Sequence, residues 1–275
     1  MYALNAVLAR RVAAALLAPA VATACALPGL VLPRARAPLH PTAAALRRAP
    51  LYLYPAYADA PDPARPPRAY VFFFGNDVGF WRAHQRLAEL LHTQGYAVAG
   101  VDVRPLLRHL PRGPARDSAF LARVDALLAG ARPALGADSA PLLVAGHSIG
   151  GELAVWTAAH LRRVPLTGVV TLSPGARGHL RVGLSDMLGR EPHGPDSFAV
   201  DSEVARIAPR ARVALVRGTK DDFRYADSAI VAAGARRFEA AGQGHSLLDL
   251  RAAGPVVLAA FAFVLGGAAP PPPPK

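Results

Sequence analysis

The sequence predicts an α/β fold, with a mostly parallel central sheet and helices on both faces. Apolar runs of strand length alternate with segments of helical spacing along the chain. Runs such as 68–75 are apolar at successive positions, as in strands that are buried on both faces. The 275 residues are enough for one such domain with a substantial core. No internal repeat is visible, so a solenoid is not expected.

The expected strands are apolar runs bounded by glycine, proline or charged residues. They cover residues 51–54, 68–75, 97–103, 142–145, 166–172, 212–216 and 235–239. Because helical segments separate most of them, consecutive strands are expected to run parallel through right-handed crossovers.

The expected helices begin with 80–94, where Leu87, Leu90 and Leu91 have helical spacing and Gly95 ends the segment. Helical patterns follow at 117–135, with Asp117 or Ser118 as the N-cap, and at 152–161, 226–233 and 255–264. Residues 76–79 and the basic, proline-bearing stretch 104–116 are expected to be loops. Residues 176–202 are expected to be irregular and to overhang the site as a small cap.

The N-terminal 26 residues resemble an export signal. Arg10 and Arg11 precede a short apolar run, and Ala22-Thr23-Ala24 fits a small-x-small cleavage site. Cys25 follows directly, as in a lipoprotein cleavage box, so lipid anchoring is one expectation and an uncleaved anchor helix is an alternative. A Pro/Ala/Arg-rich linker (27–50), one domain (51–265) and a disordered Pro-rich tail (266–275) would follow. These features predict a periplasmic or secreted protein.

The charge and the cysteine content of the chain indicate which kinds of partner and covalent link to expect. The net charge is +12, but it is spread along the chain without a basic block or a nucleic-acid-binding motif, so nucleic acid is not an expected partner. A basic surface favours approach to anionic lipid headgroups, although a solvated arginine-rich surface explains the charge equally well. The single cysteine excludes an intramolecular disulfide.

The most informative motif is Gly146-His147-Ser148-Ile149-Gly150, which follows an apolar strand and precedes a helical pattern. This strand, sharp turn and helix is typical of a nucleophile elbow. Side chains at Gly146 and Gly150 would collide with neighbouring backbone, and the turn lifts the Ser148 hydroxyl above the sheet edge. The sequence therefore predicts a nucleophilic serine.

A serine nucleophile needs a base, and the base needs an acid to orient it. Asp221 follows the strand 212–216, and His245 lies in a small-residue loop after the last strand. Taken singly, Asp221 could be a helix N-cap and His245 an idle loop residue. Their order after Ser148, each behind a strand, favours a Ser148–Asp221–His245 triad. Asp222 is the alternative acid.

The oxyanion hole needs two backbone donors. We expect the Ile149 N–H and the N–H of Asn76 or Asp77. His147, Glu152 and Trp156 flank the elbow, and packing or helix solubility is the favoured interpretation for them. The remaining histidines have no metal-ligand spacing, so neither a metal nor a cofactor is expected; they are His84, His92, His109, His160, His179 and His193.

The chain as a whole resembles the α/β-hydrolase superfamily. From about residue 70 to 264 it is also similar to the bacterial virulence protein VirJ and AcvB family. The matching stretches are Gly75-Asn76-Asp77-Val78-Gly79-Phe80-Trp81, Gly95 to Asp102, Leu172-Ser173-Pro174, Ser185 to Gly189 and Gly242-Gln243-Gly244-His245. This resemblance implies a periplasmic hydrolase acting on an aminoacyl phospholipid of the lysyl-phosphatidylglycerol type.

Two hypotheses of different classes follow. The first is an exported serine hydrolase that cleaves a carboxylic ester with the Ser148, His245 and Asp221 side chains. The second is a non-catalytic factor that keeps the fold and binds secretion or envelope components, since a fold does not guarantee a reaction. A generic esterase for small soluble esters would differ from the first only in its substrate.

Overall fold

The computed structural model describes residues 51–57, 61–183, 186, 188, 190–194, 196–247 and 249–266. The predicted signal, the linker, Cys25 and nearly all of the tail lie outside the described residues. Within this part of the chain, a seven-stranded sheet has the order β1-β3-β2-β4-β5-β8-β9. Only β1 pairs antiparallel, with β3; every other neighbouring pair in this sheet is parallel.

The strands of this sheet lie where the apolar runs predict them. They are β1 (Leu51–Tyr54), β2 (Ala69–Phe74), β3 (Tyr96–Val101), β4 (Leu142–His147), β5 (Leu166–Leu172), β8 (Arg212–Gly218) and β9 (Ala235–Ala240). The helices are α2 (Arg82–Thr93), α3 (Val103–Leu107), α4 (Ala115–Ala134), α5 (Ile149–His160), α7 (Val200–Ile207), α8 (Asp227–Ala232) and α9 (Leu250–Val264), with a 3₁₀ turn η2 (Asp222–Ala226).

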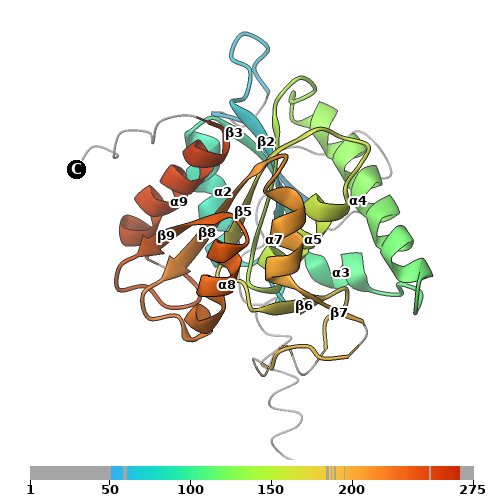
Figure 1. Cartoon of the computed structure of the whole chain (residues 1–275). Helices are drawn as coiled ribbons and strands as arrows, with labels where there is room; N and C mark the ends of the chain where they lie inside the picture. Colours follow the sequence, from blue (N-terminus) through green and yellow to red (C-terminus); the bar gives the residue numbers. More distant parts are fainter. Residues whose placement is uncertain are drawn as a thin grey trace, which may run out of the picture.

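The sheet has a hydrophobic core on each face, which confirms the predicted α/β architecture. Helices α2 and α9 pack together on one face, and α5 and α7 cover the other (Figure 1). Strand β2 serves both cores because successive side chains of a strand point to opposite faces. Tyr70, Phe72 and Phe74 enter one core, whereas Val71 and Phe73 enter the other.

The expected loop 104–116 begins as a helix instead. Asp102 caps α3, because its carboxylate accepts the Arg104 N–H at 3.0 Å and also pairs with the Arg104 guanidinium at 2.7 Å. Pro105 lies in the first turn, where a missing N–H costs no helical hydrogen bond. The predicted cap of α4 is also wrong, since α4 starts at Ala115 with Pro114 at the N-cap and Asp117 lies in its first turn.

The expected irregular segment 176–202 contains a second, two-stranded sheet. Strands β6 (Arg177–His179) and β7 (Ser197–Ala199) pair antiparallel, and α7 begins directly after β7. The last helix, α9, starts earlier than Pro255 because Asp249 caps it, accepting the Arg251 N–H at 3.0 Å.

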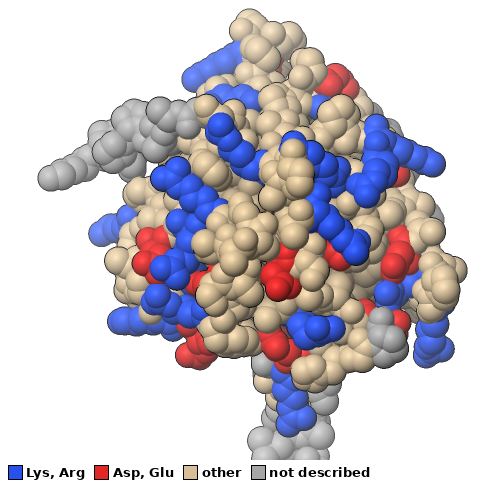
Figure 2. Space-filling view, viewed as in Figure 1, with Lys and Arg blue, Asp and Glu red and all other residues tan. Residues whose placement is uncertain are grey.

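The surface seen in Figure 2 carries lysine and arginine side chains over much of its extent, with acidic side chains between them. None of the helices in the described part of the chain combines the length and the apolar character that a membrane crossing requires.

Candidate active site

The candidate nucleophile occupies a strained turn between β4 and α5. Ser148 has φ 56° and ψ −128°, a conformation that side-chain-bearing residues rarely adopt. A Cβ at Gly146 would overlap the carbonyl of Gly150, and a Cβ at Gly150 would overlap the carbonyl of Gly75. The Ser148 N–H donates to the Leu172 carbonyl at 2.9 Å, which ties the turn to β5. Both glycines are therefore required by close backbone approach.

The structure brings Ser148, His245 and Asp221 together in one hydrogen-bonded line. The Ser148 Oγ lies 2.9 Å from His245 Nε2, and His245 Nδ1 lies 3.2 Å from Asp221 Oδ1. The three residues follow β4, β9 and β8, whose carboxyl ends share one edge because the strands are parallel. Asp222 is exposed and starts η2, so Asp221 is the acid that contacts His245.

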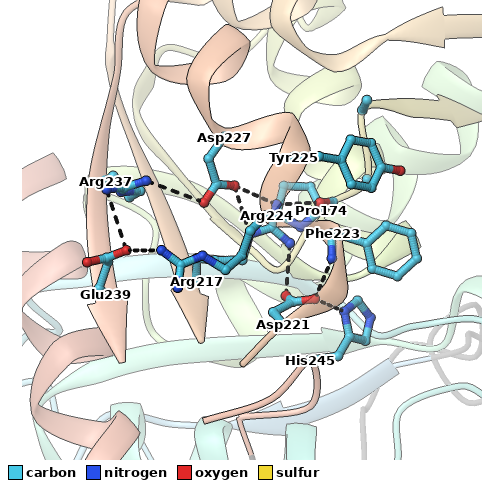
Figure 3. Close-up of polar contacts among 12 residues, drawn as sticks. Pro174, Arg217, Asp221, Phe223, Arg224, Tyr225, Asp227, Arg237, Glu239 and His245 are labelled. Carbon is cyan, nitrogen blue, oxygen red and sulfur yellow. Dashed lines mark hydrogen bonds and ion pairs between the residues drawn. The ribbon is translucent and has the colours of Figure 1, made fainter. Parts of the chain in front are cut away.

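A buried arginine, Arg217, holds Asp221 from the side opposite His245 (Figure 3). Its Nη1–H donates to Asp221 Oδ2 at 2.9 Å, its Nε–H to Asp227 Oδ1 at 2.8 Å, and its Nη2–H to the Pro174 carbonyl at 2.7 Å. Burial raises the pKa of Asp221, but hydrogen bonds from His245, Arg217 and the Phe223 N–H outweigh it and hold that pKa well below its usual range. Asp221 therefore stays ionised beside the imidazole.

The expected oxyanion donors are not equally placed. The Ile149 N–H belongs to the first residue of α5, and the first four N–H groups of a helix have no partner within it. The Asn76 N–H donates to the Gly79 carbonyl at 3.2 Å inside the loop after β2. Asp77 lines a pocket together with Ser148 and Ile149. Of the two loop residues, Asp77 is thus the better candidate for the second donor.

The pocket beside Ser148 is small and has both charged and apolar lining residues, with Ile149, Pro192 and Phe223 among the apolar ones. Its volume is about 50 Å³, and acidic and basic side chains both line it: Asp77, Glu152, Asp186, Glu191, Arg177 and Arg190. Glu191 ties the segment between β6 and β7 to its surroundings, because its Oε1 accepts the Ala176 N–H at 2.9 Å and the Tyr225 hydroxyl at 2.7 Å. The charged part of this lining suits polar groups, and the small volume suits a short group rather than a long alkyl chain.

Glu152 is more than a solubilising residue of α5. It is buried, it lines the pocket, and its Oε1 accepts the Gly175 N–H at 3.0 Å. Burial raises its pKa to about 8, against the opposing effect of the Gly175 N–H, so the side chain is largely protonated at neutral pH. Trp156, by contrast, packs as expected, edge-on to Phe120 and stacked on His160.

Sequence reasoning placed His147 beside the elbow only as a packing residue and gave His84 no role, yet both take part in contacts around the site. Both are buried, and a hydrogen bond of 3.1 Å joins their rings. His147 also donates to the backbone carbonyl of His245 at 2.8 Å. The signal for His84 was its spacing, since it lies three residues before Leu87 on the buried face of α2. Among the described residues, no group of three or more histidine, cysteine or acidic side chains is arranged to hold a metal ion.

No family model matches the chain, and no curated protein matches its sequence. Solved structures do resemble it. Est1E from Butyrivibrio proteoclasticus superposes with a TM-score of 0.51 at 17% identity, over 72% of this chain and 86% of that one. A putative dienelactone hydrolase from Klebsiella pneumoniae superposes with a TM-score of 0.47 at 20% identity, over 70% of this chain and 80% of that one. The thioesterase domain from the curacin biosynthetic pathway superposes with a TM-score of 0.48 at 15% identity, over 76% of this chain and 93% of that one. The sheet order, the strained serine turn and the likeness to Est1E show that the chain has the α/β-hydrolase fold.

Proposed function

We propose that the protein is a serine hydrolase of carboxylic esters. Ser148 is the nucleophile, His245 the general base and acid, and Asp221 the residue that orients the imidazole. The observation that carries the proposal is the continuous line of hydrogen bonds from Ser148 through His245 to Asp221, which starts at a strained turn on the sheet edge. Serine hydroxyls become nucleophilic when a base is held in this way.

In the first half of the reaction, His245 Nε2 accepts the Ser148 proton while the Oγ attacks the ester carbonyl carbon. The Nδ1–H of His245 donates to Asp221, which stabilises the imidazolium that forms. The Ile149 and Asp77 N–H groups bind the developing oxyanion. The tetrahedral intermediate then collapses, the alcohol leaves with the proton from His245, and an acyl-serine remains.

In the second half, His245 accepts a proton from water, which attacks the acyl-serine carbonyl. Collapse of this second intermediate releases the carboxylic acid and returns the proton to Ser148 Oγ. The acyl or alcohol group beside Ser148 meets a small pocket lined by charged side chains. We therefore propose a substrate with a polar group next to the scissile ester, rather than a fatty acyl group.

The more specific proposal is an aminoacyl phospholipid in the cell envelope. It rests on the sequence resemblance to the VirJ and AcvB family and on the export signal predicted in residues 1–26. The charged side chains of the pocket are compatible with an aminoacyl group, and the basic surface is compatible with approach to an anionic lipid layer. Cys25 is the proposed attachment point if the protein is lipid-anchored.

Labelling with a fluorophosphonate tests the nucleophile. We expect the natural protein to be labelled, Ser148→Ala to give no signal, and Ser202→Ala, which removes an exposed serine elsewhere, to be labelled normally. Equal labelling of Ser148→Ala and the natural protein would refute the assignment. If Ser148→Ala cannot be labelled yet keeps the full biological function, the protein acts as a binding factor instead.

Substrate and location need separate experiments. Incubation with total membrane lipid, followed by mass spectrometry, should show loss of an aminoacylated lipid with the natural protein and none with Ser148→Ala. Faster turnover of long-chain fatty esters than of short or aminoacyl esters would contradict the polar-substrate proposal. Cell fractionation of the natural protein and of Cys25→Ser tests export and anchoring, since only the natural form should remain with membranes if Cys25 is lipidated.

A further inference from the structure

Two buried histidines connect α2 to the loop that carries His245. We infer that His147 and His84 form a relay of neutral imidazoles that holds the His245 backbone, and that both are positioning residues for the reaction proposed above. The inference rests on that proposed function, because it gives His245 the role of base. Neither histidine touches Ser148 Oγ or Asp221 through a hydrogen bond, so their effect passes through His245.

The hydrogen bonds of the relay allow a single arrangement of protons. The Trp81 N–H donates to His84 Nδ1 at 3.3 Å, so the ring proton of neutral His84 is on Nε2. His84 Nε2 lies 3.1 Å from His147 Nδ1, which therefore accepts. His147 then carries its own proton on Nε2, which donates to the His245 carbonyl at 2.8 Å. Every nitrogen of both rings has a partner in this arrangement.

The surroundings keep both rings neutral, as the relay requires. His84 and His147 have 0% and 1% of their surface exposed. The ring of His84 contacts the aromatic rings of Phe73 and Phe80. Burial lowers the pKa of His84 well below its usual value, and burial with the nearby His245 lowers the pKa of His147 to about 4. A protonated ring could not accept the hydrogen bond that each Nδ1 receives.

The relay matters because it binds the backbone of His245 itself. Other hydrogen bonds fix the neighbouring loop residues: the Lys220 N–H donates to the Gln243 carbonyl at 2.8 Å, and the Gly242 N–H donates to the Thr219 hydroxyl at 2.8 Å. The backbone carbonyls of Gln243 and Gly244 also pack closely against Gly218. The His245 side chain is 33% exposed. His147 is covalently joined to Ser148, so its hydrogen bond to the His245 carbonyl fixes the position of His245 relative to Ser148. A misplacement of about 1 Å in such a site can reduce the rate roughly 100-fold.

The proton positions can be measured without any activity. When the histidines of the protein are labelled with ¹⁵N, long-range proton–nitrogen NMR spectra at pH 7 distinguish the two neutral tautomers of each ring. We expect His84 and His147 both to carry the proton on Nε2. A proton on Nδ1 of either ring, or a charged ring at pH 7, would overturn the relay. This outcome does not depend on whether the protein hydrolyses esters.

The role of the relay is tested by replacing His147. We expect His147→Leu, which fills the space but cannot donate, to reduce kcat on p-nitrophenyl acetate and the rate of fluorophosphonate labelling roughly 10- to 100-fold, with KM nearly unchanged. His147→Gln places an N–H near the former Nε2 and should recover most of the loss. His160→Gln, at the other end of α5, is the matched control and should behave as the natural protein.

Several results would contradict the inference. One is labelling of His147→Leu at the rate of the natural protein. Another is an equal loss of activity in His147→Gln and His147→Leu when both variants unfold at the same temperature as the natural protein, because a change in packing would then explain the loss. If the His147 variants do not fold, His84→Gln and His84→Leu supply the same comparison. Absence of any labelling in the natural protein would instead refute the proposed function, while the tautomer measurement would still decide the relay.

Discussion

Arg217 and Asp221 lie side by side with both side chains fully buried, and the guanidinium Nη1 is 2.9 Å from Asp221 Oδ2. His245 Nδ1 approaches the other oxygen of the same carboxylate at 3.2 Å. The acid of the proposed triad thus has a permanent cation on one side and a titratable ring on the other. Because Arg217 also pairs with Asp227, one side chain fixes the start of η2 and the start of α8.

Replacing Arg217 with methionine should destabilise the protein strongly. The variant leaves the Asp221 and Asp227 carboxylates buried without their main partner, and breaking such a pair costs about 3–5 kcal/mol of the free energy of unfolding. Urea unfolding measures the change. Arg224→Met, which breaks a half-exposed pair with Glu239 at 2.8 Å, is the control and should cost at most about 1 kcal/mol. Similar losses in the two variants would contradict the buried network.

The two neighbouring aspartates should differ sharply in their effect on activity. Asp221→Asn removes the charge that orients His245 and should lower kcat by roughly 10⁴-fold, as loss of a triad acid does. Asp222→Asn changes an exposed side chain and should leave kcat and KM unchanged. Hydrolysis of p-nitrophenyl acetate checks both variants. A larger loss of kcat in Asp222→Asn than in Asp221→Asn would reverse the assignment of the acid.

Gly150→Ala should prevent correct folding. Its new Cβ would overlap the Gly75 carbonyl and the Phe74 carbonyl, so α5 would have to move away from β2. Gly244→Ala adds the same methyl group where no atom lies within 4 Å, so it should express and melt as the natural protein does. Soluble yield and thermal unfolding followed by circular dichroism measure the difference. Normal folding of Gly150→Ala would argue against the close approach.

Glu152 should make stability depend on pH in a definite direction. Its pKa is about 8 in the folded protein against 4.5 when unfolded, so between these values only the folded state keeps the proton. The contribution to stability is therefore full below about pH 4.5 and is lost as the pH rises towards 8. Glu152→Gln cannot titrate, so its free energy of unfolding should exceed that of the natural protein by an amount that grows over this range, on the order of a few kcal/mol.

Other groups, His147 among them, titrate in both proteins. Their contributions therefore cancel when the free energy of unfolding of the natural protein is subtracted from that of Glu152→Gln. His147 acts in the opposite sense, since its pKa of about 4 lies below the ordinary 6.5 and its contribution disappears as the pH falls between these values. A difference for Glu152→Gln that stays constant with pH would contradict a buried, protonated carboxyl.

Much of the fold was predictable because local signals agreed with the tertiary arrangement. The buried strands are continuous apolar runs, and the glycines at 146 and 150 imply the close approach that the structure contains. The order of serine, acid and histidine, each after a strand, also sufficed to select three side chains that lie together. Their catalytic roles stay predictions until the labelling and kinetics are done.

The parts that escaped prediction depend on long-range or backbone contacts. Nothing local distinguishes the Asn76 N–H from the Asp77 N–H, because every residue but proline has the same backbone donor. Only the structure shows that the Asn76 N–H is engaged by Gly79, which makes Asp77 the proposed donor. The short helix α3 was hidden by Pro105, which a first turn tolerates. Arg217 gave a signal that was overlooked, since a charge inside a buried strand requires partners elsewhere in the chain.

The segment between β6 and β7 supplies part of the pocket beside Ser148 and lies apart from the main-sheet strands that precede the three proposed catalytic residues. It contributes Asp186, Arg190 and Glu191 to the pocket, whereas Ser148, Asp221 and His245 all follow strands of the main sheet. Substitutions confined to Asp186, Arg190 and Glu191 are thus expected to alter which substrates fit, while the proposed nucleophile, base and acid stay in place. Exchanging these three side chains is therefore a direct way to look for new specificities on the same sheet.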